Sequence, residues 1–338
     1  MLWKGVVMND LLETQASRRR VGCAGIVVAD LFCGPMDALP QEGMLSVLEE
    51  MPSRAGGCAA NVAIDLVRQG VEVDLYGCIG AGGYGGMLVR ELEKAGVNPS
   101  GLARVATHPT SRTVILLIKG EDRRYLHSFG ANAAFRLDQI DRTQARQSGV
   151  FYLGGLFALP GIKLDELADF FADLRAAGVI TVLDVVLPEN FDPAGAPLAD
   201  VLAQTDYFLP NQDEARLITG RSAPLDQVRA LLDLGARRLV ITRGRHGAVA
   251  ATAGCYWECG VYQGEVMDPS GSGDAFCSGV IASILNGADM GDMLRHASAI
   301  GFSATRAIGT TDGVFGAAEA ADFLQTHHLD LIEGDFTY

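Results

Sequence analysis

The sequence contains 338 residues, 49% of them hydrophobic and 20% charged, which suits one large α/β domain or a domain with an appendage. A formal net charge of −14 argues against a nucleic-acid-binding surface, because phosphate backbones require clustered Lys and Arg, so small molecules are the expected partners. No apolar run reaches the ~18 residues of a membrane span, and seven cysteines without a CxxC pair favour reduced thiols, so we expect a cytoplasmic protein that does not associate with membranes.

Two common kinds of site are disfavoured by the motif pattern. No Gly-Lys-Ser or Gly-Lys-Thr occurs, so nucleotide phosphates cannot be held by a Walker-type P-loop. Cys255 and Cys259 are the closest cysteine pair, but no histidine lies near enough in sequence to complete a zinc pattern. Any nucleotide must therefore be held by a different loop, and a zinc site is not expected.

The first buried strand is predicted near the N-terminus. Residues 1–20 have the composition of a tail, and the apolar run from Val21 to Ala29 predicts a strand that ends in Asp30. An aspartate just past the carboxyl end of a strand in an α/β sheet faces the crevice where ligands bind, although loop solvation also explains many such aspartates. Several prolines and glycines in residues 31–54 favour an irregular or hairpin excursion over a core element.

Two glycine-led helix starts follow. Gly56 and Gly57 open an apolar, helix-like run that includes Asn61, and close packing of a helix on the sheet would also explain these glycines. Residues 80–85 match G-x-G-x-x-G between a predicted strand and a predicted helix, which is the setting of a dinucleotide-binding fold. That fold also expects an acidic residue ~20 positions later, and residues 103–106 contain none, so this motif alone supports NAD binding weakly.

The middle of the chain alternates predicted strands and helices. Residues 111–118 and 125–129 flank a Gly-Glu-Asp turn as the two strands of a hairpin. Strands at 151–153 and 179–183 surround a helix-like segment at 164–177, which is the order of a βαβ unit with a parallel sheet. Asp184 stands at the carboxyl end of the second of these strands.

Two further strand ends carry polar residues. A strand at 207–209 precedes Asn211, and Glu214 three residues later completes the pattern of a helix capping box. A strand at 239–242 runs into a turn that contains His246, which we expect to be solvated rather than catalytic.

The segment from Asp268 to Gly279 reads D-P-S-G-S-G-D-A-F-C-S-G and is the most informative stretch of the chain. Glycines 271 and 273 allow successive backbone N–H groups to converge at the start of a helix, where the helix dipole also favours negative charge. Such a loop suits a transferring phosphoryl group, and the carboxylate of Asp274 beside it suits a general base. A capped helix after a flexible loop would produce the same spacing.

These motifs together resemble the ribokinase-like (PfkB) carbohydrate kinases. The segment 268–279 is similar to the family pattern D-T-x-G-A-G-D-x-F-x-x-G, with Ser270 and Ser272 as small replacements, and residues 56–63 resemble G-G-x-x-x-N-x-A. Gly25 to Asp30, Asn211 to Glu214 and the turn after Thr242 follow in family order. One departure concerns the substrate: many relatives continue with D-P-N-x-R where this chain reads Asp184-Val-Val-Leu-Pro.

The resemblance implies a fold and a set of site residues. The expected fold is a three-layer α/β/α sandwich over residues 21–325, with a central, mostly parallel sheet, a small β-sheet lid from residues 31–54 and 109–131, and an acidic tail from 326 to 338. The implied catalytic residues are Asp274 as base and Gly271, Ser272 and Gly273 as anion hole; the implied substrate ligands are Asp30, Gly56, Gly57, Asn61 and Asn132; the implied nucleotide contacts are Asn211, Thr242, Gly244 and Gly247. Glu214 would act on Mg²⁺ through water, and Asp268, Ser270, Ala304, Ala307 and Gly309 would surround a monovalent cation such as K⁺.

The implied activity is transfer of the ATP γ-phosphoryl group to a CH₂OH hydroxyl of a small sugar, with Mg²⁺ bridging the phosphates. A nucleoside kinase is the alternative within this chemistry, and a catalytically silent sugar sensor is the alternative outside it. The oxidoreductase interpretation rests on residues 80–85 alone. The resemblance also implies a homodimer formed through lid edges.

Overall fold

The computed structural model describes residues 19–121, 123–188, 191–192 and 197–336. Most of the predicted N-terminal tail, residues 1–18, and the last two residues of the predicted C-terminal tail lie outside these ranges. Asp122, in the predicted hairpin turn, lies outside them too.

Within this part of the chain, ten strands form one sheet in the order β14-β13-β12-β11-β10-β9-β8-β1-β4-β5. The seven strands from β11 to β5 are parallel to one another, and the three at the other edge are antiparallel. The parallel strands are β1 (Arg20–Gly25), β4 (Glu72–Gly80), β5 (Asn98–Val105), β8 (Val150–Leu156), β9 (Ile180–Val185), β10 (Tyr207–Phe208) and β11 (Leu239–Thr242); the antiparallel ones are β12 (Ala248–Ala251), β13 (Cys255–Cys259) and β14 (Leu331–Asp335).

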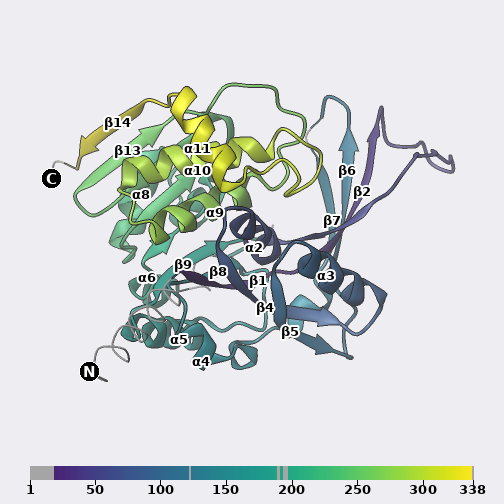
Figure 1. Cartoon of the computed structure of the whole chain (residues 1–338), viewed down its shortest axis with the longest axis horizontal. Helices are drawn as coiled ribbons and strands as arrows, with labels where there is room; N and C mark the ends of the chain where they lie inside the picture. The colour runs from purple at the N-terminus through teal and green to yellow at the C-terminus, as the bar shows by residue number, and fades with distance from the viewer. Residues whose placement is uncertain (1–18, 122, 189–190, 193–196, 337–338) are drawn as a thin grey trace, which may run out of the picture.

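Helices cover both faces of this sheet, so the expected three-layer arrangement is confirmed (Figure 1). Each face has its own apolar core, because strands that are buried on both sides carry nearly continuous apolar sequences. One core contains residues of α2 (Cys58–Arg68), α3 (Gly83–Lys94), α9 (Ser272–Leu285) and α10 (Met290–Ala304), next to α11 (Ala317–Thr326); the other contains residues of α4 (Arg142–Ala145), α5 (Leu164–Ala176), α6 (Ala199–Ala203), α7 (Gln212–Thr219) and α8 (Pro224–Asp233).

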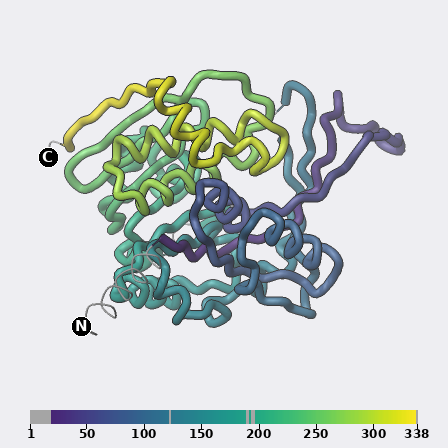
Figure 2. The backbone as a smooth tube through the Cα atoms, in the orientation of Figure 1, coloured from purple at the N-terminus to yellow at the C-terminus, as the bar shows by residue number. Residues whose placement is uncertain are grey.

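A second, smaller sheet projects from one side of the main body (Figure 1). Its strand order is β3-β2-β6-β7, from β2 (Val28–Met36), β3 (Ser53–Gly56), β6 (Arg112–Ile118) and β7 (Arg124–Ser128). Figure 2 shows the connection between β2 and β3 as the part of the chain that reaches farthest from the main body. The two segments expected to form a separate small sheet therefore do so, and we call this the small sheet.

The first predicted strand is wrong as a single element. Residues 20–25 belong to the main sheet, whereas the chain from Val28 onward belongs to the small sheet, so Asp30 lies inside a strand of the small sheet. The break follows Gly25, whose φ of +136° is a conformation that side-chain-bearing residues rarely adopt. An uninterrupted apolar run concealed this change of sheet, because both halves are buried.

The predicted C-terminal tail is wrong for its last described residues. Residues 331–335 form β14, which pairs antiparallel with β13 at the edge of the main sheet. Ile332 stays 63% exposed there, and acidic residues alternate with apolar ones. This pattern is typical of an edge strand that is solvated on one face.

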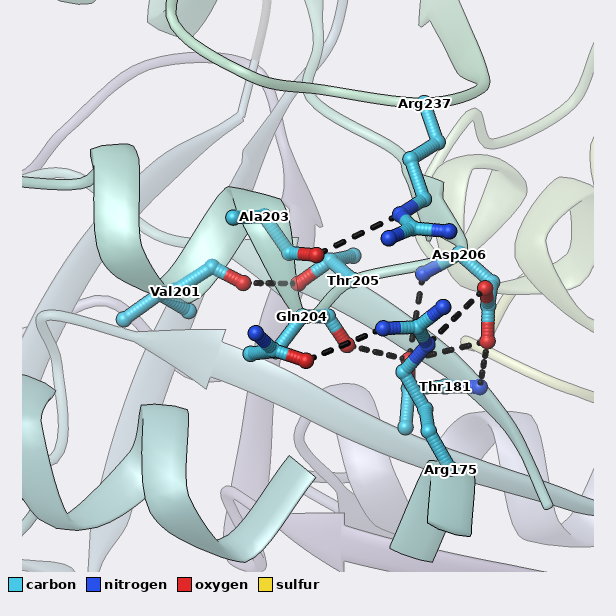
Figure 3. A network of polar contacts seen from close by, with 8 residues as sticks. All are labelled: Arg175, Thr181, Val201, Ala203, Gln204, Thr205, Asp206 and Arg237. Carbon is cyan, nitrogen blue, oxygen red and sulfur yellow. Dashed lines mark hydrogen bonds and ion pairs between the residues drawn. The ribbon is translucent and has the colours of Figure 1, made fainter. Parts of the chain in front are cut away.

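A polar network ties together the amino ends of β9 and β10 (Figure 3). Asp206 accepts hydrogen bonds from Arg175 Nε at 3.2 Å and from the backbone N–H of Thr181 at 3.1 Å. Arg175 also donates to Gln204 Oε1 at 2.9 Å, and Arg237 donates to the carbonyl of Ala203. These groups satisfy one another at the edge of the sheet remote from the glycine-led helix α9.

Candidate functional site

The glycine-led helices α2 and α9 lie side by side and start close to one another. Chain order along the sheet reverses at β1, which lies between β4 and β8, and such a switch point leaves a crevice at the carboxyl ends of the strands. Asn61 on α2 donates from Nδ2 to Oδ2 of Asp274 on α9 at 2.7 Å. Thr310 holds the other end of the Asn61 amide, donating to its Oδ1 at 3.0 Å. Two motifs more than 200 residues apart in sequence therefore meet at one carboxylate.

The loop before α9 has the backbone conformation that the sequence predicts. Gly271 is the N-cap residue with a φ of +76°, and a Cβ atom there would lie 2.0 Å from the carbonyl oxygen of Thr310. Ser272 and Gly273 form the first turn of a 14-residue helix. The N–H of Ser272 donates to the carbonyl of Pro269 at 3.3 Å, and the other N–H groups of that turn, together with the helix dipole, make the position attractive to an anion.

A group of acidic side chains surrounds this helix start. Burial raises the pKa of Asp274, although hydrogen bonds from Asn61 and Cys58 act in the opposite direction. Burial, together with the charges of Glu214 and Asp274, raises the pKa of Asp184 well above its ordinary value, and Tyr152 donates to its Oδ2 at 3.3 Å. We call Asp30, Asp184, Glu214 and Asp274 the acidic cluster.

Glu214 has two roles in the local structure. Its Oε2 accepts from the backbone N–H of Asn211 at 2.8 Å, and its own N–H donates to Asn211 Oδ1 at 2.9 Å, so the predicted capping box is confirmed. Burial, followed by the charges of Asp213 and Asp274, raises the pKa of Glu214 to about 7. The helix cap therefore leaves a carboxyl group near Asp274.

Asp30 reaches the same crevice from the small sheet. Its Oδ2 would lie 1.9 Å from a Cβ atom at Gly56, so only glycine leaves room for this carboxylate at the start of α2. Burial and the charge of Asp274 raise the pKa of Asp30 to about 7, while a hydrogen bond from Thr113 lowers it. Gly57, the N-cap residue of α2, has a φ of +90° and allows the sharp entry into the helix.

Asn132 lies deeper than the resemblance implies. It is fully buried, and its Oδ1 accepts from the backbone N–H of Val27 at 3.3 Å, between β1 and β2. Its Nδ2 group has no partner among the described residues. Asn132 thus supports the junction that carries Asp30, and its contact with a substrate stays a prediction.

A cavity of about 320 Å³ opens beside the start of α9. The predicted nucleotide residues Thr242, Gly244 and Gly247 line it together with Ser272 and Gly273. Asn211 does not line it but forms a backbone bridge to Thr242. Apolar side chains not predicted from the sequence supply most of the remaining wall: Val261, Tyr262, Val266, Phe276 and Phe302.

The glycines of the G-x-G-x-x-G match lie elsewhere. A Cβ atom at Gly85 would lie 2.1 Å from the carbonyl oxygen of Gly80, so this glycine is needed for close packing at the start of α3. None of residues 80–85 lines the cavity beside α9.

Three of the predicted cation residues, Asp268, Ser270 and Gly309, are in contact with one another at the loop 268–270. Asp268 is buried and accepts from the backbone N–H groups of Ser270 at 2.9 Å and Gly309 at 3.2 Å. The hydroxyl of Ser270 is buried and has no partner among the described residues. Ala304 is buried at the end of α10, and its carbonyl oxygen would lie 3.0 Å from a Cβ atom at Gly313, next to the backbone N–H of Ala307.

Sequence reasoning did not assign Asp184, Cys58, Thr113 or Asp65 to the site. Asp184 had a usable signal, since it ends a strand of a parallel sheet. Asp65 had none: it is fully buried on α2, neither carboxylate oxygen has a partner in the described part of the chain, and burial raises its pKa well above the ordinary value. In the described ranges, no three His, Cys, Asp or Glu side chains form a metal-binding group, and no helix is long and apolar enough to span a membrane.

Comparison with known proteins identifies related sequences and folds. The family profile described as pfkB family carbohydrate kinase matches residues 19–314. The 2-dehydro-3-deoxygluconokinase of Bacillus subtilis is 27% identical over 287 residues, covering 79% of this chain and 86% of that protein. The D-beta-D-heptose 7-phosphate kinase of Bordetella bronchiseptica is 28% identical over 324 residues, covering 93% and 99%.

Solved structures agree with the fold. A fructokinase with bound ATP from Xylella fastidiosa superposes with a TM-score of 0.78 at 20% identity, covering 91% of this chain and 98% of its own. A putative ribokinase II from E. coli in complex with ATP and Mg²⁺ gives a TM-score of 0.77 at 22% identity, covering 91% and 99%. These likenesses confirm the ribokinase-like architecture.

Proposed function

The chain belongs to the pfkB family of carbohydrate kinases, and we propose that it transfers the γ-phosphoryl group of ATP to a CH₂OH hydroxyl of a small carbohydrate. The observation that carries the proposal is the position of Asp274. Its carboxylate lies in the first turn of α9, one residue after Gly273, beside the backbone N–H groups of the helix terminus. The N–H of Ser272 donates to the carbonyl of Pro269 at 3.3 Å, and the terminus as a whole suits a phosphoryl group. A proton acceptor and an anion hole therefore share one helix terminus.

The chain's own groups divide the chemistry between them. Asp274 takes the proton of the attacking hydroxyl, and its raised pKa makes it a stronger base than an exposed aspartate once it is ionised. The N–H groups of Gly271, Ser272, Gly273 and Asp274 hold the charge that develops on the transferring group. Asn61 donates to Oδ2 of Asp274, and Cys58 also hydrogen-bonds to this carboxylate, so the substrate hydroxyl would share the carboxylate with these two residues. The attacking and leaving oxygens must be in line, so positioning supplies much of the rate.

The acidic cluster fits a divalent cation carried by the nucleotide phosphates. In the described residues no Lys, Arg or His forms an ion pair with Asp184, Glu214 or Asp274, and the charge of Asp274 contributes to the raised pKa values of Asp184 and Glu214. Mg²⁺ typically retains several waters and binds through one or two carboxylates together with phosphates, so Glu214 and Asp184 would hold it through water. When bound, the ion neutralises charge on the β- and γ-phosphates.

A monovalent cation such as K⁺ fits the loop behind the anion hole. The orphaned Ser270 hydroxyl, the Asp268 carboxylate and the Ala304 carbonyl offer oxygen ligands in a buried place. Ala307 and Gly309 complete the proposed ring with backbone groups. A cation there would stabilise the backbone from which the N–H groups of Gly271 to Gly273 project.

The acceptor is proposed to bind between the small sheet and α2. Asp30, Gly56, Gly57 and Asn61 line its hydroxyl-binding side, with Asn132 supporting the junction beneath them. The small sheet would act as a lid that excludes water and so suppresses ATP hydrolysis. Contact already exists between its hairpin and the anion-hole loop, because Arg123 donates to the carbonyl of Pro269 at 3.3 Å.

The small sheet also supports the proposal of a homodimer. Met44, Leu45 and Val47 are 68%, 87% and 86% exposed on its long connection, and Leu126 is 63% exposed on β7. An exposed apolar group of this kind on a sheet edge is typical of an interaction surface. Light scattering at micromolar concentration should give twice the chain mass, and a monomer mass would contradict the dimer.

A nucleoside acceptor is the second candidate. It is favoured by one relative, the aminoimidazole riboside kinase of Salmonella typhimurium, which is 25% identical over 283 residues. A catalytically silent sugar sensor is disfavoured, since a sensor does not require a buried carboxylate at the anion hole.

ADP release with Mg²⁺ and ATP across pentoses, hexoses, keto-deoxy acids and nucleosides tests the function, with Asp274→Asn as the blank. We expect release with one class of acceptor and not with the others. ADP release only with nucleosides would mean that the acceptor is a nucleoside and not a sugar. Binding of sugars or nucleosides without any ADP release would overturn the kinase proposal.

A further inference from the structure

Four residues form a row across the small sheet. Arg54 on β3 lies opposite Asp30 on β2, Asp30 lies opposite Thr113 on β6, and Thr113 lies opposite His127 on β7. Directly opposed residues on neighbouring strands point to the same face of a sheet. The row therefore continues from the acidic cluster, through Asp30, to the outer strand of the small sheet.

Hydrogen bonds connect three members of this row. The Thr113 hydroxyl hydrogen-bonds to the Asp30 carboxyl group, and this bond lowers the pKa of Asp30. Thr113 Oγ1 and His127 Nδ1 are 3.0 Å apart. The ring of His127 packs edge-on against Phe129 at 5.0 Å between centroids, which fixes its plane.

The direction of the bonds follows from counting protons. A threonine hydroxyl has one proton, and an ionised carboxylate can only accept, so Thr113 donates its proton to Asp30 whenever Asp30 is ionised. Thr113 Oγ1 can then only accept from His127, so Nδ1 of the ring must carry a proton. Partial burial lowers the pKa of His127, so the ring is neutral near pH 7 and its Nε2 atom is an acceptor.

We infer that His127 and Thr113 are positioning residues for the acceptor: His127 donates to Thr113, Thr113 donates to Asp30, and this relay aims the Asp30 carboxylate at a hydroxyl of a polyhydroxylated substrate. The inference rests on the proposed function, because it assigns Asp30 to the acceptor. Arg54, the other neighbour of Asp30 in the row, donates to the carbonyl of Ser53, and Thr113 is the member of the row that hydrogen-bonds to the Asp30 carboxyl group. The relay acts on binding of the acceptor, whereas Asp274 acts on the chemical step.

Substitution of His127 by asparagine or by glutamine tests which of its two ring nitrogens is needed. The Nδ2 group of Asn can replace the Nδ1 donor of His, whereas the amide of Gln reaches the position of Nε2 and loses the Nδ1 donor. We expect His127→Asn to keep the KM for the acceptor within about 3-fold, and His127→Gln, His127→Ala and Thr113→Val to raise it about 10-fold, the effect of one hydrogen bond to a charged group. The kcat and the KM for ATP should stay within about 3-fold in all four variants.

A double-mutant cycle tests whether the two residues act as one relay. Because each substitution breaks the same chain of bonds, His127→Ala combined with Thr113→Val should raise the acceptor KM no more than either change alone. Ser128→Ala, on the next position of β7 and the opposite face, is the matched control and should change nothing. Multiplied effects of the two substitutions would contradict the relay, as would rescue by Gln instead of Asn.

Nitrogen-15 NMR of the histidine rings gives a readout that is independent of activity. Because the pKa of Asp30 is about 7, the spectra are recorded at a pH above it, where Asp30 is ionised. We expect the Nδ1–H tautomer for His127 in the native protein under these conditions and loss of that preference in Thr113→Val. An Nε2–H tautomer in the native protein would overturn the relay even if the enzyme is a kinase. The Nδ1–H tautomer together with no ADP release from any acceptor would confirm the hydrogen bonds of the relay. It would contradict the proposed function, and with it the role of the relay in binding an acceptor.

Discussion

Strand β9 carries polar residues at both ends, and the two ends differ in whether the acidic residues there have a cationic partner. At its start, Thr181 and the neighbouring Asp206, Gln204 and Arg175 pair with one another in a closed network (Figure 3). At its end, only three residues later, Asp184 is half-buried near Glu214 and Asp274 with no cationic partner among the described residues, and its pKa is raised.

This difference distinguishes polar residues that stabilise the fold from polar residues that are proposed to act in the reaction. A buried polar group stabilises a fold only when its partners are present, and burying like charges together costs free energy. In the network at the amino end of β9, Asp206 is paired with a cation, Arg175. The members of the acidic cluster at the carboxyl end accept hydrogen bonds, but their like charges have no cationic partner among the described residues. This contrast supports the proposal that the acidic cluster has a chemical role, and each of the following predictions tests one side of it.

The largest effect is expected at the anion hole. Gly271→Ala places a Cβ atom 2.0 Å from the carbonyl oxygen of Thr310 at a φ of +76°, so the loop must move and its N–H groups lose their aim. We expect kcat for ADP release to fall about 10²-fold or more. Gly254→Ala, where a Cβ atom meets nothing within 4 Å, is the control and should leave kcat unchanged. Equal rates for the two variants would contradict the role of the loop.

The next largest effect should appear in stability alone. Asp206→Ala removes the acceptor for Arg175 and for the backbone N–H of Thr181. The side chains of Asp206 and Arg175 are only 16% and 23% exposed. The free energy of unfolding, measured with urea, should fall by about 2–3 kcal/mol. The kcat should stay within about 2-fold of the native value. A large loss of kcat at constant stability would place this network with the functional groups.

Asp65 gives a further test of this contrast, because it is a buried acid on α2, the helix that carries Asn61, and its carboxylate has no hydrogen-bond partner among the described residues. Its pKa is raised in the folded protein, so the native state keeps a proton that the unfolded chain releases above about pH 4. Stability contributed by this group is therefore present at low pH and is lost as pH rises toward the folded pKa. Leucine has similar branching and no proton, so Asp65→Leu should be more stable than the native protein, by about 1–2 kcal/mol more at pH 8 than at pH 5.

Urea unfolding at several pH values measures this difference. Asp65→Asn is the matched control, since it removes the titration but keeps an unpaired polar group, and should show the same change with pH and a smaller gain. A gain that does not vary with pH would mean that Asp65 is ionised and paired. A fall in kcat beyond about 3-fold would add Asp65 to the functional groups.

The smallest effect is expected at the margin of the network. Arg237 is exposed and makes a single bond, from Nε to the carbonyl of Ala203 at 3.3 Å. Arg237→Ala should change the free energy of unfolding by no more than about 0.5 kcal/mol. A loss of unfolding free energy as large as that of Asp206→Ala would show that the exposure of a side chain does not determine how much its hydrogen bond contributes to stability in this network.

Local sequence predicted the parts of the fold that depend on local chemistry. Glycine-led helix starts at Gly57 and Gly271 and the capping box at Asn211 were predicted because their backbone angles and caps are set within a few residues. Relations between distant residues could not be predicted in the same way. The change of sheet after Gly25, the pairing of β14 and the row from Asp30 to His127 depend on which strands become neighbours, and a single apolar or alternating run does not specify that.

The direct test of the acidic cluster is the kcat of Asp274→Asn, measured as ADP release at saturating ATP and acceptor, with the thermal midpoint of unfolding of the same preparation. We predict a loss of about 10²-fold or more in kcat, with a thermal midpoint equal to or above that of the native protein, because a charge that repels Asp184 and Glu214 has been removed. A kcat within about 3-fold of the native value, or a loss of kcat explained by unfolding, would contradict the assignment of Asp274 as the base.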